Sequence, residues 1–143
     1  MITIEVTNSP LFCLLIKNTW QKLSRYYNQQ LSKYDLTVPK ALLLLEIAPD
    51  SGRTPGFLAK SLDLENSSMT GLLDRLAKKE LIVRKPNPND RRGFLIFLTP
   101  KGIQARNTIK SLVEEMDRKL RTQLSPEEIK VFRKVISVIK KQI

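Results

Sequence analysis

The sequence contains no histidine and only one cysteine, Cys13, among its 143 residues. Without histidine, catalytic triads built on a histidine base and ordinary Cys/His zinc clusters are excluded. A single cysteine cannot form a disulfide within the chain. We therefore expect neither a metal site nor a bound cofactor.

Long apolar runs and the pattern of a secretion signal are also missing. No segment approaches the roughly 18 consecutive apolar residues that a membrane-spanning helix needs. The start of the chain, MITIEVTNSP, lacks the basic, apolar and small-residue regions of a signal peptide. We expect a cytoplasmic protein that does not associate with a membrane.

Acidic residues are scarce relative to basic ones. Asp and Glu number 14 against 25 Lys and Arg, which gives a formal net charge of +11 at pH 7. Such a charge favours a polyanionic partner, with nucleic acid as the first candidate. No phosphate-binding loop or nucleophile motif is present, and the acidic residues lie at spacings typical of solvated helix faces. We therefore do not expect an enzyme.

The segment 66–80 has the pattern of an amphipathic helix, with Asn66 placed to cap it. Its apolar residues recur at helical spacing and predict one buried face. They are Met69, Leu72, Leu73 and Leu76. The opposite face carries small or polar residues and one arginine, namely Ser67, Ser68, Thr70, Gly71 and Arg75. Short side chains let a helix approach base edges closely, and a guanidinium can reach guanine.

A short helix beginning at Thr54 and Pro55 precedes this segment, and the turn 63–65 connects the two. A connection of this length is typical of a helix-turn-helix. After the second helix, alternating residues in 81–85 and 94–98 predict a β-hairpin. Two prolines and two asparagines between these runs favour a long projecting loop over a two-residue turn.

The returning arm of this hairpin opens with Arg91 and Arg92, so its tip is basic. A small helix followed by a hairpin with arginines at its tip indicates a winged helix-turn-helix. The helix would enter the major groove and the wing would follow the DNA backbone or minor groove. Amphipathic helices beside hairpins also occur in domains that bind no nucleic acid, and a solvated arginine-rich turn is the alternative interpretation.

Helices are also predicted on both sides of this module. Ser9 followed by Pro10 indicates a helix that extends to about Tyr34. Thr99 and Pro100 begin another helix, and the capping box of Ser125 and Glu128 begins the last. The fold class is therefore mainly α with a small β-hairpin wing.

Two segments resemble MarR-type transcriptional regulators. The wing pattern of that family, DxRxxxxxLTxxG, is matched in full by Asp90, Arg92, Leu98, Thr99 and Gly102. The helix-end pattern, DRLxxKGL, is matched from Asp74 onward but departs at Glu80, where the family commonly has a left-handed glycine. Gly71 departs as well, since many members carry a longer side chain there.

The resemblance implies a single MarR-type domain over 1–143. In the family, helices corresponding to 10–34 and 100–143 interlock as a homodimer, and 38–98 is the winged-helix DNA-binding module. It further implies a sequence-specific regulator that binds double-stranded DNA at a pseudo-palindromic operator with half-sites about 10 bp apart. We expect a repressor; a sequence-nonspecific architectural DNA-binding protein is the alternative.

The resemblance also implies roles for individual residues. The wing aspartate matching Asp90 braces the arginine matching Arg92. Release from DNA follows a small-molecule effector or oxidation in the family, and Cys13 with Tyr27 resembles the sensor site of its peroxide-sensing branch. A cysteine among apolar neighbours is more often a small buried core residue, and that interpretation of Cys13 stays open.

Overall fold

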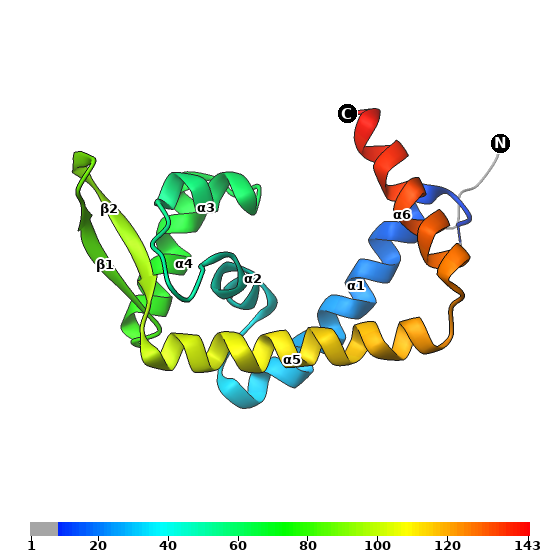
Figure 1. Ribbon diagram of the computed structural model, residues 1–143, viewed down its shortest axis with the longest axis horizontal. Helices are drawn as coiled ribbons and strands as arrows, with labels where there is room; N and C mark the ends of the chain where they lie inside the picture. Colours follow the sequence, from blue (N-terminus) through cyan, green and yellow to red (C-terminus); the bar gives the residue numbers. More distant parts are fainter. Residues whose placement is uncertain (1–8) are drawn as a thin grey trace. The chain divides into compact units, whose positions relative to one another are not determined.

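The computed structural model describes residues 9–143, which form a mainly helical fold with one β-hairpin, as predicted (Figure 1). The elements are α1 (Phe12–Leu31), the 3-10 helix η2 (Ser32–Tyr34), α2 (Val38–Glu46), α3 (Pro55–Ser61), α4 (Asn66–Lys78), β1 (Ile82–Asn87), β2 (Asp90–Leu98), α5 (Pro100–Thr122) and α6 (Pro126–Lys141). Residues 1–8 make up most of the N-terminal segment that was predicted to lack a signal peptide, and they lie outside the described residues. Among residues 9–143, no helix is long and apolar enough to cross a membrane.

The chain divides into two compact units within α5. One unit ends at Arg106 and contains α1 to α4, the hairpin and the first turns of α5. The other comprises Asn107–Ile143, with the remainder of α5 and all of α6. The predicted DNA-binding elements therefore all belong to the first unit.

The core of the first unit is built from apolar side chains of α2, α3, α4 and β2. Its largest fully buried residues are Leu43, Leu44, Ile47, Leu58, Met69, Leu73, Leu76 and Ile96. The four apolar residues predicted to form the inner face of α4 are all buried. Their burial fixes which face of α4 remains available to a partner.

α3 and α6 begin where the sequence predicted, and in both a side chain caps the first turn. Thr54 accepts a hydrogen bond from the Phe57 N–H at 3.0 Å, and the predicted capping box of Ser125 and Glu128 is complete. The bonds from Ser125 hold the pKa of Glu128 below its ordinary value. These contacts are local in sequence, which is why cap chemistry predicts them.

Two predicted helix starts were wrong. α1 begins at Phe12 with Leu11 as N-cap, because Leu11 has an extended backbone, with φ −65° and ψ 134°. Ser9 Oγ accepts from the Leu11 N–H and closes a turn before the helix. In α4 the N-cap is Glu65, and Asn66 is the first helical residue.

Glu80, which follows α4, has a φ of 61°, the left-handed conformation that glycine adopts without strain. Replacing Glu80 by glycine is expected to raise the free energy of unfolding by about 1 kcal/mol, because the native strain is relieved. Urea denaturation measures this change. Lys78→Gly, within α4, is the matched control and should lower stability by about 1 kcal/mol. Equal losses in both variants would show that Glu80 is unstrained.

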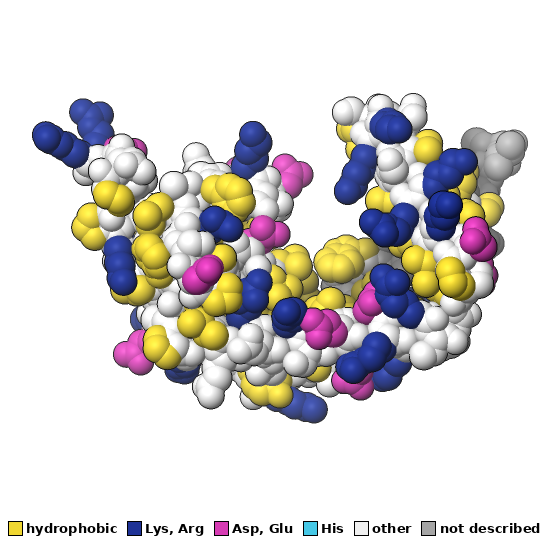
Figure 2. Space-filling model, viewed as in Figure 1, with side chains coloured by type: hydrophobic (Ala, Val, Ile, Leu, Met, Phe, Trp, Pro, Cys, Tyr) yellow, Lys and Arg dark blue, Asp and Glu magenta, His cyan; other side chains and the backbone are white. Residues whose placement is uncertain are grey.

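The hairpin differs from the predicted long loop. Its strands pair in regular antiparallel register from Ile82 with Leu98 to Pro86 with Phe94. The register then shifts, and Asn87 pairs with Asp90 across a two-residue turn. The extra residues, Arg91 to Gly93, form a bulge in β2. Figure 2 shows Lys and Arg side chains at the tip of the hairpin.

Candidate nucleic-acid interface

The outer face of α4 presents the residues predicted to read DNA. Ser67, Ser68, Thr70 and Arg75 are exposed, and Gly71 is half-buried. A Cβ atom placed on Gly71 would meet nothing within 4 Å, so the helix surface is open there. Thr70 Oγ1 donates to the Asn66 carbonyl at 2.9 Å, which holds this side chain against its own helix.

The wing tip is shaped by two side-chain to backbone hydrogen bonds. Asp90 Oδ1 accepts from the Arg92 N–H at 3.0 Å, and Asn87 Oδ1 accepts from the Asn89 N–H at 3.0 Å. Arg91 and Arg92 themselves are exposed. Asp90 thus contacts Arg92 through the main chain, and the local turn keeps both arginines at the tip. The bracing role of Asp90 in DNA binding stays a prediction.

Asp90→Ala is expected to weaken DNA binding about threefold to tenfold, the effect of losing one hydrogen bond that orders the loop. The loss should occur although the substitution removes a negative charge. Asp90→Asn keeps an oxygen that can accept from the Arg92 N–H and should retain most of the affinity. Fluorescence anisotropy at fixed salt measures both variants. Unchanged or tighter binding by Asp90→Ala would contradict the bracing role.

Two contacts of the interface were not predicted from the sequence. Arg84 Nη2 lies 2.6 Å from Asp74 Oδ1, which joins the hairpin to the outer side of α4. The Arg84 guanidinium also lies 5.6 Å from the centre of the Phe94 ring. Arg84 therefore braces the wing as well as adding charge. A ten-residue separation across the end of a helix has no periodic signal in the sequence.

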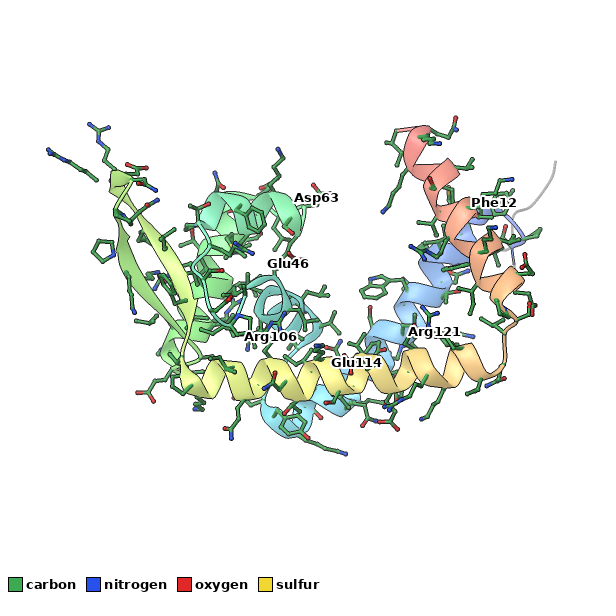
Figure 3. All side chains as sticks on the ribbon, viewed as in Figure 1. Phe12, Glu46, Asp63, Arg106, Glu114 and Arg121 are labelled. Atoms are coloured by element: carbon green, nitrogen blue, oxygen red, sulfur yellow. The ribbon has the colours of Figure 1, made fainter. Side chains whose placement is uncertain are left out.

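Two further contacts hold neighbouring elements to this module. Arg106 reaches from α5 to α2, where its Nη2 donates to the Leu45 carbonyl at 3.2 Å (Figure 3). Arg53 pairs with Ile96 through two backbone hydrogen bonds of 3.0 and 2.7 Å, so the loop before α3 lies along β2. Both contacts connect residues far apart in the sequence.

The candidate sensor residues lie on α1. Cys13 is exposed, so the alternative that it is a buried core residue is wrong for the single chain. Tyr27 is half-buried, and its ring packs edge-on against Tyr26 with centroids 5.3 Å apart. Fourteen residues of helix separate Cys13 from Tyr27 by roughly 21 Å. The two do not meet within one chain, so any contact between them requires a second subunit.

The comparisons with known proteins agree with this geometry. The family model described as MarR family matches residues 36–94. The multiple antibiotic resistance protein MarR of Escherichia coli (strain K12) is 34% identical over 116 residues, covering 80% of this chain and 81% of that protein. This chain belongs to the MarR family. A transcriptional regulator of Bacillus subtilis, YhbI, is 32% identical over 85% of this MarR-family chain and 79% of its own length.

Solved structures of two relatives share the winged-helix fold of this MarR-family protein. A cysteine-to-serine mutant of E. coli MarR complexed with operator DNA has a TM-score of 0.77 and 32% identity, covering 87% of this chain and 90% of its own. The S. aureus MepR–DNA complex has a TM-score of 0.84 and 25% identity, covering 93% and 98%. The names of the relatives are those of regulators, in agreement with the prediction that the chain is not an enzyme.

Proposed function

We propose that this MarR-family protein is a dimeric, sequence-specific DNA-binding transcriptional regulator that acts as a repressor. One observation carries the proposal: an exposed face of small polar residues on α4 lies in the same compact unit as an arginine-bearing wing. The DNA complexes of E. coli MarR and S. aureus MepR support it.

In this proposal α4 enters the major groove, and its short side chains allow close approach to base edges. Arg75 contacts a base or phosphate, while Arg91 and Arg92 contact the backbone or the minor groove. The net charge of +11 adds a sequence-independent attraction through counterion release. Base contacts would then supply the specificity that distinguishes a regulator from an architectural protein.

Dimerisation is proposed because apolar side chains on α1 and α6 remain uncovered in the single chain. Phe12 is 67% exposed and Phe132 is 65% exposed. Other exposed apolar residues on these helices are Leu15, Ile16, Trp20, Val131 and Val138. A second copy would cover such surfaces and would present two α4 helices to a pseudo-palindrome. Sedimentation equilibrium tests this assembly.

Release from DNA is proposed to follow either a small-molecule effector or oxidation. A ligand that binds one arrangement of the dimer more tightly shifts the spacing of the two reading helices. Cys13 is exposed in the single chain and is thus open to an oxidant there. Peroxide and phenolic compounds, added separately to the DNA complex, distinguish these routes, with Cys13→Ser as the control for oxidation.

The experiment that tests the function is a selection from random duplex DNA with reduced protein, near 0.15 M salt and with competitor DNA. An enriched palindrome is the expected result. Binding without enrichment would instead support an architectural protein. Absence of binding by the reduced protein would contradict both. Repression is then tested by transcription in vitro from a promoter that carries the selected sequence.

A further inference from the structure

The C-terminal end of α4 is attached to the turn that precedes α2. Lys79, the C-cap of α4, places Nζ 2.7 Å from Asp35 Oδ2 and also donates to the Asp35 carbonyl oxygen. The Lys79 side chain is only 25% exposed, whereas that of Asp35 is 91% exposed. The lysine is therefore directed onto the protein surface and away from solvent, unlike its exposed neighbour Lys78.

The same end of α4 is bonded to the start of α5. Lys101 Nζ donates to the Lys79 carbonyl at 3.1 Å, and Thr99 Oγ1 donates to the Glu80 carbonyl at 2.6 Å. The Thr99 N–H donates to the Leu81 carbonyl at 3.1 Å. Segments on both sides of the DNA-binding elements thus converge on three consecutive residues at the end of α4.

Asp35 is held in a defined conformation at this junction. Its φ is 56°, and its N–H donates to the Ser32 carbonyl at 3.1 Å. The next residue, Leu36, is buried and donates to the Leu31 carbonyl at 3.2 Å. This is the hydrogen-bonded left-handed turn that ends many helices. The turn fixes the backbone of Asp35, so its carbonyl faces Lys79 independently of the carboxylate.

The charges around Lys79 explain why a carboxylate is needed there. Partial burial, followed by the charge of Lys79, lowers the pKa of Lys40, and the charge of Arg75 acts in the same direction. Asp35 opposes these effects, and its own pKa is lowered by its hydrogen bond and charge interaction with Lys79. Two cations, Lys79 and Lys40, therefore share the carboxylate of Asp35. Without it, the repulsion between Lys79 and Lys40 would weaken the hold of Lys79 on the turn.

We propose that Lys79 is a positioning residue: bound to Asp35, it fixes the C-terminal end of the reading helix to the turn between α1 and α2. The inference rests on the proposed function, since the helix that it positions is the one proposed to read DNA. It separates two adjacent lysines by task. Lys78 contributes charge to the exposed surface. Lys79 orients the C-terminal end of α4 and releases no counterion on DNA binding.

The test compares Lys79→Met with Lys78→Met, because each removes one positive charge at neighbouring positions. Lys79→Met should lower affinity for the selected DNA about twofold to fivefold, as expected for one lost surface ion pair, without changing the slope of log K against log salt. Lys78→Met should make that slope shallower. Lys79→Arg, which keeps the charge and the donors, should restore most of the affinity.

Asp35→Asn is a control that removes a negative charge instead of a positive one. Asparagine tolerates the left-handed conformation of this residue. The Asp35→Asn variant should weaken binding, though by less than Lys79→Met because the backbone carbonyl at position 35 still accepts from Lys79, whereas removing a negative charge would strengthen binding through electrostatics alone. The double variant should bind no more weakly than Lys79→Met. Tighter binding by Asp35→Asn, or a Lys79→Met slope that matches Lys78→Met, would overturn the proposal.

A measurement without DNA separates this inference from the proposed function. Amide hydrogen exchange of the N–H groups of Lys79, Glu80 and Leu81 should be faster in Asp35→Asn and Lys79→Met, and unchanged in Lys78→Met. If wild-type protein selects no DNA sequence while this exchange pattern is observed, the function fails and the junction stands. Unchanged exchange in all variants would show that the contact does not hold the end of α4.

Discussion

Replacing Gly102 by alanine is expected to lower the free energy of unfolding by at least about 3 kcal/mol, which is roughly 10 °C in Tm for a chain of this size. A Cβ at this position would overlap the carbonyl oxygen of Leu81 and would lie 3.0 Å from its carbonyl carbon and 3.3 Å from Leu98 Cδ2. The obstacle is backbone, which cannot rotate away as a flexible side chain can.

Relaxation at this site is limited because Leu81 is bonded on both sides. Its N–H donates to the Leu76 carbonyl at 3.0 Å, and its carbonyl accepts from the Thr99 N–H at 3.1 Å. Gly56→Ala is the matched control, since a Cβ on Gly56 in α3 would meet nothing within 4 Å. Thermal unfolding followed by circular dichroism compares the two. Equal Tm values would show that α5 shifts to admit the methyl group.

Arg92→Ala is expected to lower affinity for the selected DNA about tenfold or more, because an exposed guanidinium at the wing tip is proposed to contact the DNA backbone or minor groove. The slope of log K against log salt should become shallower by about 0.9, the amount expected for one lost phosphate contact. Titrations at several salt concentrations measure both quantities.

Arg118→Ala is the control for the wing variant. Arg118 is exposed on α5 in the second compact unit, so its removal changes the net charge equally. We expect little change in affinity and slope for this variant. If Arg92→Ala behaves as Arg118→Ala does, the wing does not contact DNA at Arg92, and the contribution of charge is general.

The parts of the fold that the sequence predicted correctly depend on neighbouring residues. The spacing of Met69, Leu72 and Leu76 defines the buried face of α4 because helical periodicity decides which side chains point inward. The capping box at Ser125 was predictable for a similarly local reason. The arginines of the wing tip were predictable because they directly follow the turn residues in the sequence. The candidate DNA-reading face was predictable because it is what remains after the inner face is assigned.

The parts that could not be predicted depend on pairing between distant segments. The two-residue turn of the wing arises from cross-strand register, which places the additional residues in a bulge of β2. The contact of Lys79 with Asp35 joins residues 44 positions apart. The Asp74–Arg84 ion pair depends on the orientation of the hairpin against α4. None of these contacts has a periodicity that a single sequence displays.

If α4 reads DNA as proposed, the hydrogen bond from Thr70 to the Asn66 carbonyl restricts the bases that Thr70 can recognise. A threonine hydroxyl carries one proton, and here that proton is committed to the helix. The side chain then offers only acceptor lone pairs and a methyl group. It suits the amino group of adenine or cytosine, or the methyl group of thymine, and disfavours the O6 and N7 edge of guanine. Selected operators should therefore be depleted of guanine at the base facing Thr70. In Thr70→Val, the base preference at this position should shift toward thymine.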